Sequence, residues 1–189
     1  QYLKKLQTVF EENKEKIAEV ISRETGKPNW ESLTEVAAMI NKIPITIDQA
    51  MKLVEDVVVE NALPGTKGRV IYKPRGVMTV VGPFNFPGHL PNGHIIPALA
   101  TGNTVVFKPS ELTPTTGQIY AECIHRAGFP AGVFNLVQGV GETGRRLVEH
   151  ELVDGILFTG SYETGLKIKQ GTMNHYWKIH ALEMGGKNA

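Results

Sequence analysis

Residues 133–161 read VFNLVQGVGETGRRLVEHELVDGILFTGS, and this stretch decides the fold. Its apolar run over Val133–Val137 predicts a strand, residues 142–150 have the spacing of an amphipathic helix, and Gly155–Phe158 predicts a second strand. A helix between two strands indicates a crossover connection, which joins parallel strands of one sheet. The stretch therefore predicts one strand–helix–strand unit with a glycine-rich turn after its first strand.

The same alternation continues on both sides of this unit. Strands are predicted over Val77–Val81 and Thr104–Phe107, and a helix over 113–127 leads into the unit. A helix over about 162–173 and a strand over 178–182 follow it. The predicted fold class is α/β, a Rossmann-like parallel sheet with crossover helices. Ligands of such sheets bind beyond the carboxyl ends of the strands, so residues at those ends are the candidates for a site.

Two long helices are predicted before the sheet. Apolar residues from Tyr2 to Ile21 recur at spacings of three and four, and Gly26 ends that helix. A second helix is expected from about Trp30 to Val57, with Pro44 as a place where it could kink. Residues 69–72 predict a further short strand.

Composition excludes several classes of function. The 189 residues carry 20 Lys and Arg against 19 Asp and Glu, so a net charge of +1 gives no reason to expect nucleic acid as a partner. No apolar run is long enough for a membrane span. One cysteine cannot form an internal disulfide, which favours a reducing compartment, the cytoplasm. The chain starts inside a helical pattern and stops after a glycine pair, so we expect a fragment of a longer enzyme.

The segment Gly139–Gly144 matches the G-x-G-x-x-G pattern of dinucleotide-binding turns. It follows a predicted strand and opens a predicted helix, which is the context that phosphate binding requires. The pattern also calls for an acid at the end of the next strand, and there the sequence has Thr159, Gly160 and Ser161 instead. Gly139, Gly141 and Gly144 are therefore either cofactor-binding residues or a tight turn only.

Two further strand ends carry candidate cofactor contacts. Lys108 and Glu111 can grip the two hydroxyls of a ribose, one as donor and one as acceptor, but a solvent-exposed ion pair is the more common outcome of such spacing. At Gly160 and Ser161, backbone N–H groups could face a phosphate. The alternative for Ser161 is an ordinary helix cap.

Glu183 and Asn85 are the candidate catalytic residues. Glu183 follows a predicted strand and precedes glycines, where partial burial would make it a general base; a loop carboxylate bonded to nearby N–H groups is equally consistent. Asn85 lies between aromatic and proline neighbours, and an amide held by so rigid a loop makes a preorganised oxyanion donor. An Asn that caps the following helix would look similar.

Two other features are set aside. His89 and His94 do not have the spacing of a zinc site, so no metal is expected. Cys123 shares one helical stripe with apolar residues, which indicates an inert core thiol and not a nucleophile.

Taken as a set, five motifs resemble the aldehyde dehydrogenase superfamily, in order and spacing over almost the whole chain. They are PFNFP at 83–87, PALATGNTVVFKPSE at 97–111, GFPAGVFN at 128–135, FTGS at 158–161 and LEMGGK at 182–187. Three more segments resemble a narrower group, the bacterial succinylglutamate semialdehyde dehydrogenases of arginine catabolism. They are GHLPNGH at 88–94, RETGKP at 23–28 and MINKI at 39–43.

The resemblance implies a role for each candidate. Asn85 would place its amide on the oxyanion, and Glu183 would activate the water that hydrolyses a thioester. Lys108 and Glu111 would hold the adenosine ribose of NAD. Gly160 and Ser161 would sit against its pyrophosphate, and the turn that contains Gly139, Gly141 and Gly144 would lie near the adenine end.

The resemblance also implies a domain plan. Residues 1–60 would be N-terminal helices of the NAD-binding domain, 61–76 part of an oligomerisation segment, and 77–189 its Rossmann-like sheet, with the catalytic domain absent. The nucleophilic cysteine of the family would lie beyond Ala189. The chain alone is therefore expected to be inactive.

The implied function of the parent enzyme is NAD-dependent oxidation of N-succinylglutamate 5-semialdehyde to N-succinylglutamate. Its partners would be this small semialdehyde and further copies of itself in a homo-oligomer. Two alternatives remain open, another semialdehyde or aliphatic aldehyde as substrate, and a catalytically silent NAD-binding fragment.

Overall fold

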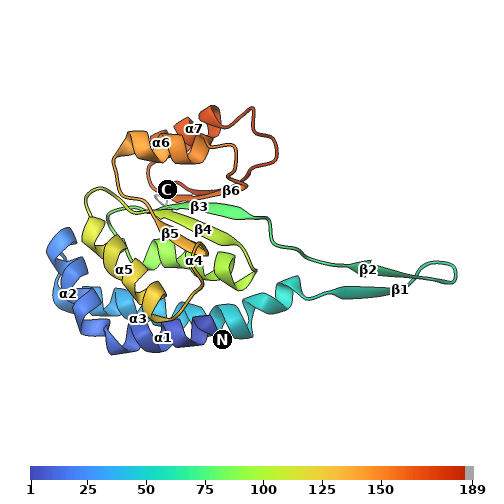
Figure 1. Ribbon diagram of the computed structural model, residues 1–189, viewed down its shortest axis with the longest axis horizontal. Coiled ribbons are helices and arrows are strands. Elements are labelled where there is room, and N and C mark those ends of the chain that lie inside the picture. The colour runs from blue at the N-terminus through green and yellow to red at the C-terminus, as the bar shows by residue number, and fades with distance from the viewer. Residues whose placement is uncertain (186–189) are drawn as a thin grey trace, which may run out of the picture.

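A computed structural model describes residues 1–185 and shows a five-stranded parallel sheet (Figure 1). The strands lie in the order β5-β4-β3-β6-β7. Their bounds are β3 Val77–Val81, β4 Thr104–Lys108, β5 Phe134–Leu136, β6 Gly155–Thr159 and β7 Ile179–Glu183. Numbered from the first parallel strand this is the order 3-2-1-4-5, which is the start of the doubly wound Rossmann arrangement. The predicted fold class is confirmed, and the strand ends agree with prediction to within a residue or so.

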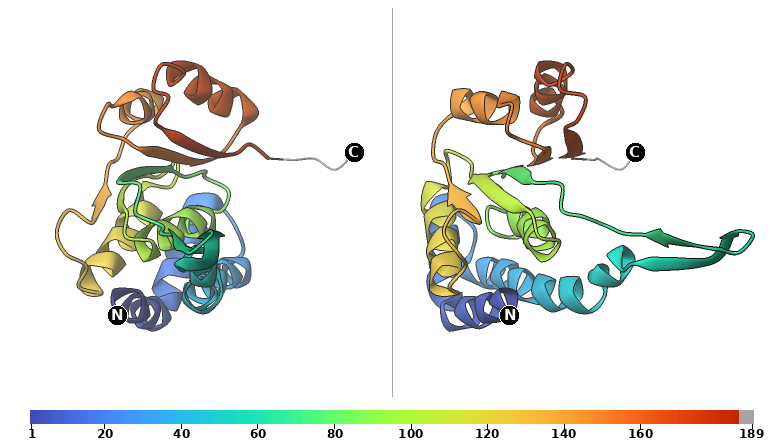
Figure 2. Two further views of the ribbon diagram at one scale, coloured as in Figure 1. Left: turned by 90° about the vertical axis from the view of Figure 1, so that its right-hand side faces the viewer. Right: turned by 45° about the vertical axis from the view of Figure 1, so that its right-hand side comes forward.

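Each connection between strands of this sheet that are consecutive in the sequence contains one helix. These helices are α4 His89–Ala100, α5 Pro114–Arg126, α6 Gly141–Glu149 and α7 Tyr162–Gly171. Helices α4 and α5 lie on one face of the sheet, and α6 and α7 lie on the other (Figures 1 and 2). The sheet is therefore covered on both faces, as its apolar strands require.

The larger of two hydrophobic cores lies between the sheet and five helices. It includes Phe10, Val36, Ile95, Phe107 and Tyr120, all at most 2% exposed. The smaller core lies under α6 and α7 and centres on Ile156 and Phe158. The N-terminal helices thus complete one face of the sheet domain and do not form a unit of their own.

The N-terminal helices differ in detail from the prediction. They are α1 Tyr2–Glu12, α2 Lys14–Thr25, α3 Asn29–Asp48 and the short 3-10 helix η1 Ala50–Val54. The single helix expected before Gly26 is broken at Asn13, whose side-chain amide donates to the Val9 carbonyl at 2.6 Å and competes with the helical backbone. Helix α3 continues past Pro44 but ends at Asp48, before the expected Val57.

Residues 57–70 form a hairpin that the sequence interpretation missed in part. Strand β1, Val57–Leu63, pairs antiparallel with β2, Thr66–Val70. The predicted helix to Val57 is wrong, because Val57 begins β1 and pairs with Val70. The strand predicted over 69–72 is confirmed only for Arg69 and Val70, where β2 ends. A run of three valines before Pro64 and Gly65 was the available signal. The hairpin projects away from the body (Figures 1 and 2).

Candidate functional site

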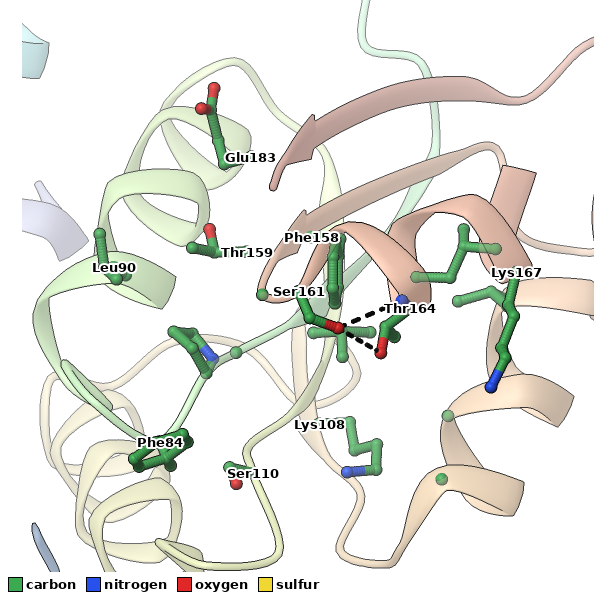
Figure 3. A pocket seen from close by; sticks show the side chains of 18 of the residues that line it. Phe84, Leu90, Lys108, Ser110, Phe158, Thr159, Ser161, Thr164, Lys167 and Glu183 are labelled. Carbon is green, nitrogen blue, oxygen red and sulfur yellow. Dashed lines mark hydrogen bonds between the residues drawn. The ribbon is translucent and has the colours of Figure 1, made fainter. Parts of the chain in front are cut away.

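One cavity opens at the carboxyl edge of the sheet. Strands β3 and β6 are neighbours, although β4 and β5 lie between them in sequence, so the chain reverses its direction of strand addition here. A crevice forms at such a point because the connections leave for opposite faces of the sheet. The cavity has a volume of about 1250 Å³ (Figure 3). Eight of the nine predicted site residues line it, namely Asn85, Lys108, Glu111, Gly141, Gly144, Gly160, Ser161 and Glu183.

Lys108 is the last residue of β4 and is 3% exposed. Its Nζ donates a hydrogen bond to the Pro109 carbonyl oxygen at 2.9 Å and lies 3.7 Å from a carboxylate oxygen of Glu111. Burial lowers the pKa of Lys108, and the Glu111 carboxylate opposes that shift. The alternative of a solvent-exposed ion pair is wrong for the lysine. An ammonium has three N–H donors, so Lys108 can still donate a hydrogen bond to a ligand that contacts both Lys108 and Glu111.

The three glycines of the G-x-G-x-x-G segment have different roles. Gly139 has a φ of +150°, and a Cβ there would lie 2.1 Å from Thr143 Oγ1, so this position needs glycine for the turn itself. It is the predicted site residue that does not line the cavity. Gly141 begins α6, and a Cβ on Gly144 would lie 3.5 Å from Lys108 Cδ. That distance is an ordinary van der Waals contact, so packing against Lys108 does not require glycine at this position.

A charged cluster on α6 borders the cavity and was missed by the sequence interpretation. Glu142 accepts hydrogen bonds from both Arg145 and Arg146 at 2.8–2.9 Å, and these bonds lower its pKa to about 2. Arg145 also donates to Glu149 at 2.7 Å. The spacing of three and four residues was the signal. Of this cluster, Glu142, Arg145 and Glu149 line the cavity, so one guanidinium group lies at its wall.

At the end of β6, Ser161 caps helix α7. Its Oγ accepts a hydrogen bond from the Thr164 N–H at 3.2 Å, and the two hydroxyls lie 3.0 Å apart (Figure 3). The cap interpretation is confirmed, and Ser161 also lines the cavity. The Gly160 N–H is occupied, because it donates to the Glu183 carbonyl at 3.0 Å. The expectation that this N–H faces a phosphate is therefore wrong.

Asn85 lies in the loop between β3 and α4, with its side chain exposed on the cavity wall. It does not cap the helix, since α4 begins at His89 with Gly88 as its N-cap residue. The side chain of Glu35 takes the capping place and accepts hydrogen bonds from both of those backbone N–H groups. The helix-cap alternative for Asn85 is wrong, and Asn85 is a lining residue of the cavity.

Glu183 is the last residue of β7, so the loop alternative is wrong for its backbone. The partial burial expected of Glu183 is also wrong, because the residue is exposed at the strand end. It lies opposite Thr159 of β6 in the strand register. Thr159 Oγ1 lies 3.1 Å from His94 Nε2, and burial lowers the pKa of His94 while the Glu183 carboxylate opposes that shift. His94 is a cavity residue that the sequence interpretation considered only as a metal ligand. No signal in the sequence alone placed this helix residue beside the ends of β6 and β7.

Within residues 1–185, no group of three or more His, Cys, Asp or Glu side chains is placed to hold a metal ion. In the same range no helix is both long and apolar enough to cross a membrane. Cys123 is 2% exposed, and burial raises its pKa to about 11. It is a core thiol, as its helical stripe predicted. Gly186 and Lys187, the end of the last quoted motif, lie outside the described residues.

The geometry can be compared with known proteins. The chain is 51% identical over 172 residues to N-succinylglutamate 5-semialdehyde dehydrogenase from Novosphingobium aromaticivorans. That alignment takes in 91% of this chain and 36% of the relative, so the chain spans about a third of the length of its curated relative.

Solved structures match nearly all of this chain and a similar share of their own length. A point mutant of betaine aldehyde dehydrogenase from Staphylococcus aureus, in complex with NAD+, is 34% identical, with a TM-score of 0.91 over 99% of this chain and 38% of that one. An NAD-dependent aldehyde dehydrogenase from Sinorhizobium meliloti is 31% identical, with a TM-score of 0.93 over 100% and 37%. An NADP-dependent enzyme from E. coli is 32% identical, with a TM-score of 0.91 over 98% and 38%. Residues 1–189 match the aldehyde dehydrogenase family as a whole, and the chain belongs to that family.

Proposed function

We propose that the protein carrying this chain oxidises N-succinylglutamate 5-semialdehyde to N-succinylglutamate with NAD as the electron acceptor. The observation that carries the proposal is that one cavity is lined by both the candidate cofactor-binding residues and the candidate catalytic residues. Lys108 and Glu111 line it together with Asn85 and Glu183. A cofactor and an aldehyde could therefore meet within it.

The residues at the Lys108 end fit a ribose. A buried ammonium with donors to spare and a carboxylate 3.7 Å away offer one donor and one acceptor to a pair of neighbouring hydroxyls. A carboxylate at that place also repels a 2′-phosphate, which supports NAD over NADP. The similar structures include enzymes described with each cofactor, so the preference rests on Glu111.

The start of α7 fits the pyrophosphate. A Cβ on Gly160 would lie 2.5 Å from the Phe158 ring, so glycine here lets the backbone turn closely at the strand end. The first N–H groups of a helix have no partner within it and attract anions. A phosphate would therefore use the first turn of α7, with the Ser161 hydroxyl beside it, and not the Gly160 N–H.

At the other end of the cavity, the chain's own residues would act on the aldehyde. The Asn85 amide would donate a hydrogen bond to the aldehyde oxygen and stabilise the negative charge that develops there. The Glu183 carboxylate would accept a proton from the attacking water. Bound NAD would supply the two-electron acceptor of the oxidation. The thiol nucleophile implied by the family resemblance is not Cys123, since that thiol is buried and has a pKa of about 11.

The substrate rests on sequence similarity. The 51% identity to a succinylglutamate semialdehyde dehydrogenase supports this aldehyde, and another semialdehyde is the alternative. The proposal also includes a cytoplasmic location and a homo-oligomer. For the oligomer, the support is the projecting hairpin, on which Val57, Val58 and Leu63 are 49%, 56% and 68% exposed. In the proposed domain plan, residues 61–76 belong to that oligomerisation segment.

A direct assay tests the proposal. The full-length protein is incubated with N-succinylglutamate 5-semialdehyde or succinate semialdehyde, and with NAD or NADP, and formation of the reduced cofactor is followed by absorbance. A higher kcat/KM for the first aldehyde with NAD is expected. A preference for succinate semialdehyde would contradict the substrate, and a preference for NADP would contradict the role of Glu111.

A further inference from the structure

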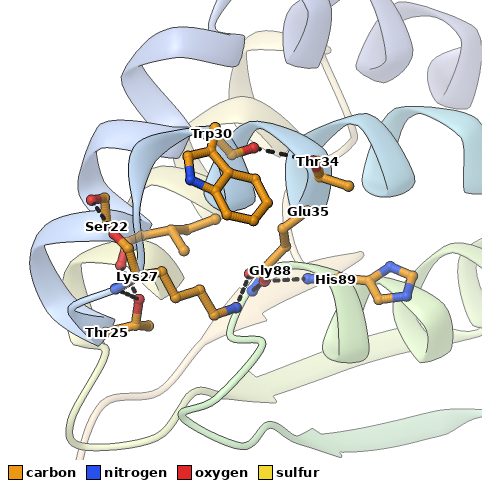
Figure 4. A network of polar contacts seen from close by, with 9 residues as sticks. Ser22, Thr25, Lys27, Trp30, Thr34, Glu35, Gly88 and His89 are labelled. Carbon is orange, nitrogen blue, oxygen red and sulfur yellow. Dashed lines mark hydrogen bonds and ion pairs between the residues drawn. The ribbon is translucent and has the colours of Figure 1, made fainter.

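Glu35 is a buried carboxylate that holds the start of helix α4. It lies in α3 and is 3% exposed. Its Oε1 accepts hydrogen bonds from the backbone N–H groups of Gly88 and His89 at 2.9 and 3.0 Å (Figure 4). The N-terminus of a helix carries a partial positive charge, which an acid stabilises. An acid 53 residues away in sequence thus replaces the usual local cap.

Lys27 balances the charge of Glu35 and also contacts the loop that contains Asn85. Its Nζ lies 2.7 Å from Glu35 Oε2, and the two side chains are 12% and 0% exposed. The same ammonium lies 3.5 Å from the centre of the Phe86 ring, which is a cation–π contact. Ser22 fixes the backbone at Lys27, since its hydroxyl donates to the Lys27 carbonyl at 2.6 Å (Figure 4). One ammonium thus connects α3 to the residue next to Asn85.

The loop over residues 82–88 is anchored at both ends. At its start, the Gly82 N–H donates to the Lys108 carbonyl at 3.0 Å. At its end, Gly88 packs so closely on α3 that an added Cβ would lie 2.6 Å from Met39 Sδ. Asn85 lies midway between these anchors in sequence and lines the cavity, so a shift at the Glu35 end of the loop would move it.

We infer that Glu35 and Lys27 are positioning residues for Asn85, and that they hold its amide at the place where the aldehyde oxygen develops charge. The inference rests on the proposed function, because it needs Asn85 to contact that oxygen. A donor stabilises an oxyanion only at the correct position, so a small shift of the loop lowers the rate while the fold persists. NAD binding at Lys108 and Glu111 does not depend on the pair.

The test uses Glu35→Gln, which keeps an acceptor for the Gly88 N–H but loses the charge, and Lys27→Met, which loses the cation. In the full-length protein, we expect each to lower kcat about 10-fold with the KM for NAD unchanged. Lys27→Arg keeps a cation near Glu35 and Phe86 and should recover most of the rate. Glu19→Gln removes an exposed ion pair with Arg23 and serves as the matched control, with parental kcat expected.

A double-mutant cycle separates positioning from folding. If Glu35 acts through Asn85, Glu35→Gln should lower kcat in the parent but hardly further in Asn85→Ala. Equal losses in both backgrounds would overturn the inference, as would a lower Tm with unchanged kcat. If Asn85→Ala alone leaves kcat unchanged, the proposed role of Asn85 fails instead. Should Glu35→Gln not fold, Lys27→Met carries the same cycle, because the Glu35 carboxylate then keeps its hydrogen bonds from the Gly88 and His89 N–H groups.

Discussion

Replacing Lys108 with methionine tests the contribution of the ammonium alone, because methionine removes the charge but keeps most of the aliphatic stem that packs beside Gly144. The proposal gives this ammonium one charge-assisted hydrogen bond to a ribose hydroxyl. Loss of such a bond costs about 1.5–3 kcal/mol, and about 1.4 kcal/mol is tenfold in affinity. Lys108→Met should therefore weaken NAD binding by about 10- to 100-fold.

The same substitution should not destabilise the fold. Burial lowers the pKa of Lys108, which means that the folded protein disfavours the charged form. The remaining partner, Glu111, has a side chain that is 52% exposed and can be solvated by water, so no unpaired buried charge is left behind. The Pro109 carbonyl loses its hydrogen bond from Nζ, which offsets part of this gain, so the free energy of unfolding should stay within about 1 kcal/mol of the parent value.

Titration calorimetry with NAD and urea unfolding of the full-length protein measure both quantities. Glu19→Gln, which removes an exposed ion pair on α2, is the control and should change neither. NAD affinity within twofold of the parent would refute the ribose role of Lys108. A weakened affinity accompanied by an equal loss of stability would refute it as well, since damage to the fold would then explain the loss.

Three further outcomes are expected. Gly139→Ala should lower the free energy of unfolding, measured in urea, by about 1–3 kcal/mol, because φ is +150° and the new Cβ would meet Thr143 Oγ1. An unchanged urea midpoint would contradict this. Gly93→Ala is the control, since a Cβ at Gly93 would have no neighbouring atom within 4 Å. The folded pKa of His94 lies below its ordinary 6.5, so the unfolded chain binds that proton more tightly and acidification below pH 6.5 should reduce stability; an NMR titration showing His94 protonated above pH 6.5 would contradict it. The isolated 189-residue chain should form no NADH with any aldehyde, because Cys123 is its one thiol and is buried; absorbance at 340 nm that rises with aldehyde would refute this.

The sheet and its strand ends were predictable because local patterns determine them. Each strand is a short, mostly β-branched or apolar run with a glycine or proline within three residues of its end. Because the strands are parallel, the residues at these ends meet at one edge of the sheet. Lys108, Ser161 and Glu183 lie at three such strand ends, and all three line the cavity. Glu111 was predictable for the same reason, because it follows Lys108 closely in the sequence.

Other features depend on contacts between distant segments, which periodicity does not encode. Glu35 caps a helix 53 residues away, and nothing near it in sequence marks it as a capping residue. His94 meets Thr159 only because α4 crosses the sheet beside β6. The prediction of one continuous helix through Asn13 failed for a local reason. The hydrogen bond from the Asn13 side chain to Val9 is a weak sequence signal against a strong helical pattern.

The burial of Cys123 gives this protein a built-in reporter of its own breathing motions. The thiol lies in the larger of the two cores, against α1, α2 and the sheet, so a labelling reagent can reach it only when that layer opens. The smaller core under α6 and α7 contains no cysteine. Thiol labelling would therefore detect opening of the helical layer that contains α1, α2 and α5. It would not detect opening of the layer formed by α6 and α7 on the other side of the sheet. Comparing its rate with and without NAD would reveal whether the two layers open as one cooperative unit or as two.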